Sequence, residues 1–146
     1  MAETKELAGK ATGPLSGVRV LDLTSVVNGA YATKLLAAQG ADVIKLEDPG
    51  SGRGGGGDIM RWAGHVPQGA PRDMGPIFLT LNRNKRSIVL DLKQASAQRA
   101  IRKLIKSCDV FAASVRYEGL KRLGLGYEDV KAIKPDIVYV HAAGYG

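Results

Sequence analysis

The chain holds one cysteine, few aromatic residues and no long apolar run. Because Cys108 stands alone, no disulfide can form within the chain, and the apolar run that follows it predicts a buried, unreactive thiol. No apolar stretch approaches the roughly 20 residues that cross a bilayer, so no membrane partner is expected. The first residues carry mixed charge and no apolar core, which fits neither a secretory signal nor a transit peptide. We therefore expect a cytoplasmic protein.

Residues that bind metals or act as nucleophiles are also scarce. The two histidines, His65 and His141, are far apart in the sequence, so no metal site is predicted. No serine lies in a G-x-S-x-G pattern and no Walker A lysine pattern is present, which leaves a hydrolase triad and a P-loop without support. Residues 50–55 match G-x-G-x-x-G, but more glycine follows where a dinucleotide site needs a helix. A flexible loop is the favoured interpretation there.

Acidic residues are outnumbered by basic ones, 14 to 21, and the net charge is +7. This excess favours an anionic partner, either a nucleic acid or a small ligand that carries phosphate. Aromatic residues make up 5% of the chain, too few for the base-stacking surfaces of nucleic-acid-binding proteins. A small phosphate-bearing ligand is therefore favoured over a nucleic acid.

The first structured segment reads as a strand, a helix and a second strand. Residues 18–23 and 41–46 are rich in β-branched and aliphatic residues, as strands are. Between them, Asn28 is placed to cap a helix and Gly40 to end it in a left-handed conformation. A strand, a helix and a strand this close together make a βαβ unit, which predicts a parallel sheet. An ordinary βα turn is the favoured interpretation of residues 24–29, with an anion facing the helix-start amides as the alternative.

Strand-like and helix-like segments alternate through the rest of the chain. A long glycine- and proline-containing loop comes first, at residues 48–76. After a short strand or helix end at 77–81, we expect strands at 87–92, 109–115 and 137–140 and helices at 94–107 and 127–134. The fold class predicted is α/β, with a Rossmann-like, open, mostly parallel sheet and flanking helices.

The last residues predict a strand that runs into a glycine-flanked turn, at 138–146. In α/β proteins, active sites gather beyond the carboxyl ends of strands. We therefore expect a site residue to follow this turn, beyond the chain.

Several segments carry a resemblance to a known family. Residues 14–24 look like its opening strand, and residues 29–47 look like its first helix and second strand. The most specific match is N-R-N-K-R-S-I-V-L-D-L-K at 82–93, and R-L-G-L-G-Y-E at 122–128 is a second signature. G-Y-G at 144–146 begins a third. On these segments the chain resembles the class III CoA-transferases, the family of formyl-CoA transferase and the carnitine CoA-transferases, to which the α-methylacyl-CoA racemases are related.

This resemblance implies both a fold and an activity. The family has a Rossmann-like half that binds CoA, so residues 14–146 would be a CoA-binding α/β domain after a flexible tail at 1–13. The family transfers CoA from an acyl-CoA to a small carboxylic acid without a metal, through an aspartate nucleophile. That aspartate lies past the G-Y-G turn, so no residue of this chain is nominated as catalytic. The resemblance also implies a homodimer, or a missing C-terminal half.

The resemblance further implies which residues contact CoA. Carried over position by position, these contacts are Val26, Val27, Asn28, Leu90, Leu92, Lys93, Arg122 and Leu123. An ammonium group and a guanidinium group are suitable partners for the CoA phosphates, as a point charge and a bidentate fork respectively.

The chain departs from the family pattern at residues 113–118 and 28–30. At 113–118 the family usually has E-N-F-R-P-G, so an amide contact and an aromatic wall are lost, and the turn chemistry changes. At 28–30 the family commonly has Ala-Gly-Pro, so the proline of the first helical turn is lost. Three interpretations stay open: a CoA-binding portion of a CoA-transferase, the same portion of a racemase-type enzyme, and a non-catalytic CoA-binding or assembly domain.

Overall fold

The computed structural model describes residues 12–50, 56–66, 71 and 73–144. Within these residues one parallel sheet has the strand order β3-β2-β1-β4-β5. In chain order the strands are β1 (Arg19–Leu23), β2 (Asp42–Glu47), β3 (Lys85–Val89), β4 (Val110–Ala113) and β5 (Val138–His141). The chain builds outward from β1 in one direction and then in the other, which is the doubly wound order of Rossmann folds. The predicted fold class is confirmed.

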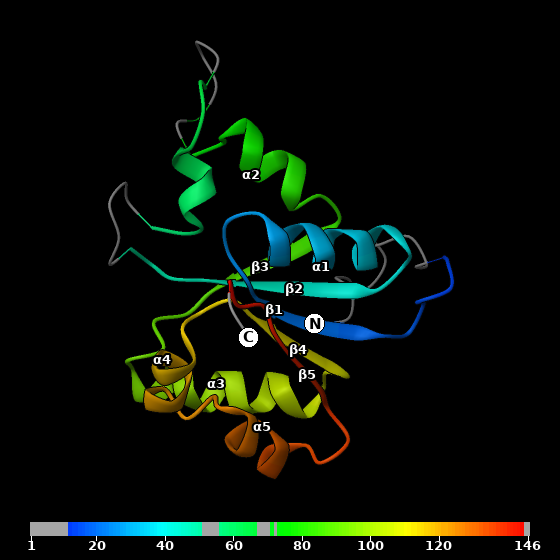
Figure 1. The fold of residues 1–146 in the computed structure, drawn as a ribbon, viewed down its shortest axis with the longest axis vertical. Helices are drawn as coiled ribbons and strands as arrows, with labels where there is room; N and C mark the ends of the chain where they lie inside the picture. The colour runs from blue at the N-terminus through cyan, green and yellow to red at the C-terminus, as the bar shows by residue number, and fades with distance from the viewer. Residues whose placement is uncertain (1–11, 51–55, 67–70, 72, 145–146) are drawn as a thin grey trace, which may run out of the picture.

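Helices cover both faces of this sheet (Figure 1). One face carries α1 (Asn28–Ala38) and α2 (Pro76–Leu81), and the short 3₁₀ helix η1 (Ile59–Trp62) lies beside α2. The opposite face carries α3 (Ala95–Lys106), α4 (Tyr117–Arg122) and α5 (Tyr127–Ile133). Among the described residues, no helix is both long enough and apolar enough to span a bilayer.

Apolar core residues lie on both faces of the sheet, because successive side chains of β1 point to opposite faces. Leu21 and Leu23 point into the larger cluster beneath α3, α4 and α5, where Phe111 and Ile101 are fully buried. Val20 points into the smaller cluster under α1. Full burial of one such side chain contributes roughly 1.5–3 kcal/mol, so these positions hold the sheet between its helices. Cys108 lies in the larger cluster, and its burial raises the pKa of the thiol, as the sequence predicted for an unreactive cysteine.

The strand predicted at 87–92 begins and ends earlier than expected. β3 pairs with β2 from Lys85, opposite Val43, to Val89, opposite Glu47, and both strands end together. The amide of Leu90 still donates to the Glu47 carbonyl at 3.0 Å, and the chain then leaves the sheet. Residues 90–93 therefore lie just beyond the carboxyl end of β3, where they line the site described below.

Two other local features differ from expectation. Val27 is the residue that precedes α1, and Asn28 is the first helical residue, with its side chain accepting from the neighbouring Gly29 amide at 2.7 Å. Helix α4 was not predicted, because its six residues are too few for a helical period. The segment at 77–81 is helical, and Gly40 ends α1 with φ at +99° as predicted. The glycines at 51–55 and most of the predicted tail lie outside the described residues.

Candidate functional site

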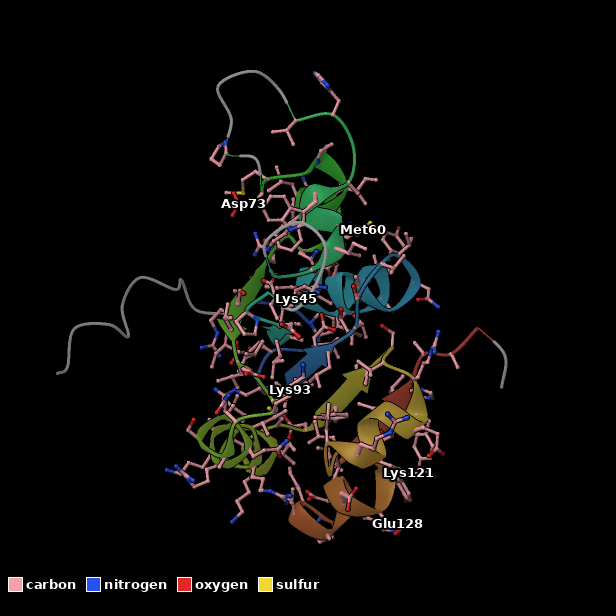
Figure 2. The ribbon with its side chains drawn as sticks, turned by 90° about the vertical axis from the view of Figure 1, so that its left-hand side faces the viewer. Lys45, Met60, Asp73, Lys93, Lys121 and Glu128 are labelled. Carbon is pink, nitrogen blue, oxygen red and sulfur yellow. The ribbon has the colours of Figure 1, made fainter. Side chains whose placement is uncertain are left out.

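A cavity of about 300 Å³ opens at the carboxyl end of the sheet. It lies where the strand order reverses between β1 and β4, and it is lined from the ends of β1 and β2 and from the segments after β3 and β4. Ligands of doubly wound proteins bind at this crevice. Figure 2 looks toward this edge and places Lys45 and Lys93 near its centre, between Met60 above and Lys121 below. We take this cavity as the candidate site.

Most of the cavity wall is aliphatic. The apolar lining residues are Leu23, Leu46, Leu90, Leu92, Val115, Leu120 and Leu123. Lys93 lies on the wall as well, in a turn where its amide donates to the Asp91 carboxylate at 3.0 Å. An apolar slot with a lysine suits a ligand that carries a flat or aliphatic group joined to an anion.

The polar part of the cavity wall contains a buried ion pair. Lys45 Nζ lies 2.7 Å from Asp58 Oδ2, and both side chains are 2% exposed. Lys45 also donates to the carbonyl of Thr24 at 2.8 Å, and Asp58 Oδ1 accepts from the Ser25 hydroxyl at 3.1 Å. The pair therefore connects β2 and the segment before η1 to the end of β1.

Glu47 anchors this same segment to the sheet. Its carboxylate accepts from Arg61 Nε and Nη2, both at 2.7 Å, from the Ser87 hydroxyl at 2.6 Å and from the Asp58 amide at 2.8 Å. Burial alone would raise the pKa of Glu47, but these donors together lower it to about 2. The Arg61 guanidinium also stacks 3.8 Å over the Phe78 ring, which joins α2 to the same anchor.

A second buried pair supports the turn after β1 from the α1 side. Asp22 accepts from Lys85 Nζ at 2.9 Å, from the Thr33 hydroxyl at 2.7 Å and from the Thr24 amide at 2.9 Å. Burial lowers the pKa of Lys85, while the Asp22 carboxylate acts in the opposite direction. In the turn itself, Val26 has φ at +66°, a left-handed conformation that β-branched residues rarely adopt.

Within the described residues, no group of three or more His, Cys, Asp or Glu side chains is placed to hold a metal ion. The cavity instead combines an aliphatic slot, the lysines Lys45 and Lys93 and the first two residues of the turn after β1, Thr24 and Ser25. This arrangement is equipped to bind a ligand, and its acidic side chains, those of Glu47, Asp48, Asp58 and Asp91, are engaged in ion pairs and hydrogen bonds within the protein.

The sequence matches the model of CoA-transferase family III over residues 15–146. The chain belongs to CoA-transferase family III. It is 42% identical over 135 residues to a mouse (Mus musculus) protein named succinyl-CoA:glutarate CoA-transferase, an alignment that covers 91% of this chain and 29% of the relative. It is also 42% identical over 132 residues to a formyl-CoA:oxalate CoA-transferase of Afipia carboxidovorans, covering 90% and 29% of the two chains.

A solved crystal structure has the same fold as this chain. The crystal structure of Rv3272 from M. tuberculosis superimposes with a TM-score of 0.80 and 34% identity, over 93% of this chain and 36% of that one. The chain thus spans about a third of the length of the proteins that it matches.

The structure brings half of the CoA contacts predicted from the family resemblance to the cavity. Leu90, Leu92, Lys93 and Leu123 line it, although Leu123 is distant from the others in sequence. The other four predicted residues are Val26, Val27, Asn28 and Arg122. Their side chains are not among the lining residues, and all eight contacts stay predictions.

Sequence reasoning did not single out several polar residues of the cavity, among them Lys45, Glu47 and Asp58, whereas Ser25 lies in the turn at 24–29 that it did consider. Lys45 and Glu47 carried a signal, since charged residues within an otherwise apolar central strand need buried partners. Asp58 gave no signal, because it follows a run of glycines that fits any loop.

At residues 113–118, where the chain departs from the family pattern, the structure shows a polar contact made by Ser114. Ser114 stands where the family usually has asparagine, and its hydroxyl accepts from the Ser25 amide at 2.8 Å. This bond joins the ends of β1 and β4 across the reversal point. Ser114 therefore provides a polar contact of its own at this position.

Proposed function

We propose that this chain is the CoA-binding N-terminal portion of a class III CoA-transferase. The intact enzyme would transfer CoA from an acyl-CoA to a small carboxylic acid. The observation that carries the proposal is that two distant segments with family signatures, 90–93 and Leu123, line one cavity at the reversal point of the sheet. The aliphatic slot would accept the adenosine end of CoA, and Lys93 would contact phosphate.

The turn after β1 supplies the second part of the proposed CoA site. It lies at the amino end of α1, where free backbone amides and the helix dipole favour an anion. Val26, Val27 and Asn28 form this turn, and both valines are exposed. Together with Arg122 at the end of α4, they would complete the contacts implied by the resemblance.

The chemistry of the intact enzyme follows the family pattern. An aspartate carboxylate attacks the thioester carbonyl, the C–S bond breaks, and CoA leaves as a thiolate while an aspartyl anhydride forms. The thiolate then attacks the aspartyl carbonyl, which releases the donor acid and leaves an enzyme thioester. The acceptor carboxylate reverses these two steps. In the family this aspartate follows the G-Y-G turn, so we nominate no nucleophile among these residues.

Both relatives named above are CoA-transferases, which favours transfer over racemisation. Their names pair a CoA thioester with a dicarboxylic acid, and we propose an acceptor of this small carboxylic acid class. A homodimer and a cytoplasmic location are further parts of the proposal. The altered residues 113–118 favour a second candidate, a non-catalytic domain that binds CoA weakly or serves in assembly.

Calorimetric titration of the chain with CoA tests the proposal. Saturable binding with one site per chain is expected, together with no CoA transfer by the chain alone. Absence of binding would favour the assembly domain. Transfer by the chain alone would contradict the assignment of the nucleophile to a position outside these residues.

A further inference from the structure

Asp58 holds two consecutive residues of the turn after β1. Its Oδ1 accepts from the Ser25 hydroxyl at 3.1 Å. Its Oδ2 lies 2.7 Å from Lys45 Nζ, and that ammonium donates to the Thr24 carbonyl at 2.8 Å. Asp58 therefore fixes Ser25 directly and Thr24 through Lys45.

Asp58 is itself fixed on the sheet. Its amide donates to Glu47 at 2.8 Å, and its Oδ1 accepts from the Met60 amide at 2.9 Å at the start of η1. On the far side of the turn, the Ser25 amide donates to Ser114 at 2.8 Å. A continuous polar chain thus runs along the carboxyl edge of the sheet, from β2 through Asp58 and Ser25 to the end of β4.

The next residue of the turn needs this support. Val26 has φ at +66°, a conformation in which a β-branched side chain is strained. The residue is 49% exposed, so close packing does not hold it in place. Such a conformation persists only where its neighbours over-determine it, and here those neighbours are Thr24 and Ser25 on one side and α1 on the other.

We propose that Asp58 is a positioning residue for ligand binding, which holds the turn at 24–28 in its binding shape. This inference rests on the proposed function, because it takes CoA as the ligand. Its predicted effect on CoA affinity is opposite to the effect that charge alone would have. Removal of a carboxylate beside an anionic ligand would strengthen binding through charge alone, whereas loss of a positioning contact weakens it.

Titration of variants with CoA separates these effects. Asp58→Asn should bind CoA about tenfold more weakly than the wild-type chain, a change of about 1.4 kcal/mol. Ser25→Ala removes only the direct contact and leaves the ion pair in place, so about a threefold loss is expected. The matched control is Asp136→Asn, which removes an exposed carboxylate paired with Lys134 and should leave affinity unchanged. Circular dichroism verifies that each variant is folded. If Asp58→Asn does not fold, the affinity of Ser25→Ala for CoA decides between the two effects.

A comparison in the Val26→Gly background tests whether Ser25 affects CoA binding by holding the turn in its strained shape. Glycine adopts the left-handed conformation without strain, so the turn depends less on its neighbours. In the Val26→Gly background, Ser25→Ala should therefore lose less affinity than it does beside Val26. An equal loss in both backgrounds would overturn the positioning role.

The outcomes distinguish the two proposals. If the wild-type chain does not bind CoA, the proposed function fails, and this inference fails with it. If the wild-type chain binds CoA but Asp58→Asn and Ser25→Ala bind it equally well or more tightly, only the positioning role of Asp58 is contradicted.

Discussion

Lys45 and Asp58 form an ion pair at 2.7 Å in which both side chains are almost completely buried. Burial of two charges is costly, and their attraction offsets that cost only while both are present. The pair lies on the wall of the candidate CoA cavity and fixes the turn after β1. Unfolding measurements on variants of this pair test its contribution to stability, and CoA titrations test its contribution to the site.

The first prediction concerns the stability of this pair. Lys45→Met leaves Asp58 buried without its counter-charge and should reduce the free energy of unfolding by about 3–5 kcal/mol. Urea denaturation monitored by circular dichroism measures this change. The double variant Lys45→Met with Asp58→Leu should recover part of the loss, because no unpaired charge remains.

The control for this prediction is Lys121→Met. Lys121 pairs with Glu118 at 2.6 Å, but both side chains are half-exposed or more. Such an exposed pair contributes little to stability, because water screens the attraction and the side chains lose freedom when they pair. Equal losses for Lys45→Met and Lys121→Met would show that burial adds nothing to the Lys45 pair.

The second prediction concerns pH. The pKa of Glu47 is about 2 in the folded chain and near 4.5 when the group is unperturbed. Because the folded value is depressed, the stabilisation is fully present above pH 4.5 and is lost as the pH falls toward 2. The shift corresponds to about 3 kcal/mol. The urea midpoint of the wild-type chain should therefore fall toward that of Glu47→Gln as the pH is lowered from 5 to 2.

A constant difference between these two chains over that range would contradict the assignment to Glu47. Other carboxylates also titrate there, and Asp42, beside Arg86 and Arg19, has a lowered pKa as well. Their titration affects the wild-type chain and Glu47→Gln alike, so the difference between the two isolates Glu47.

The strands and α3 were predictable because their patterns are local. Leu21 and Leu23 alternate with residues of the other face, and Ala97, Ile101 and Ile105 form a helical stripe. The limits of β3 were not predictable, since they depend on pairing with β2, where Lys85 lies opposite Val43. β3 ends where its pairing with β2 ends, at Val89 opposite Glu47, and that information lies in another part of the chain.

Part of the candidate site was predictable from the family resemblance, whereas its buried polar contacts were not. Leu90, Leu92 and Lys93 stand in a segment with a specific family signature. The contact of Asp58 with Ser25 and Lys45 has no sequence pattern, because a glycine-rich loop separates Asp58 from both. Such a contact depends on where the fold places Asp58 relative to the ends of β1 and β2, which residue types alone do not specify.

The third prediction concerns strain in the turn. Val26→Asn should raise the free energy of unfolding by about 0.5–1 kcal/mol, because asparagine tolerates the left-handed conformation that Val26 adopts. The structure already has asparagine at its other left-handed non-glycine residue among those described, Asn84. The control is Val138→Asn on the exposed edge strand β5, where no gain is expected. A gain of the same size in both variants would show that the effect comes from a polar side chain in contact with water and not from relief of backbone strain.

The last prediction concerns the two cations proposed to contact CoA phosphates. Lys93→Ala and Arg122→Ala should each weaken CoA binding several-fold, and the remaining affinity should depend less on salt, because a screened charge interaction has been removed. Calorimetry at two salt concentrations measures both effects. The matched control is Lys103→Ala on α3, an exposed cation outside the cavity lining, which should change neither. If Lys93→Ala and Arg122→Ala both bind as the wild-type chain does, phosphate recognition must come from the turn at 24–28. The transfer of these two contacts from the family would then be wrong.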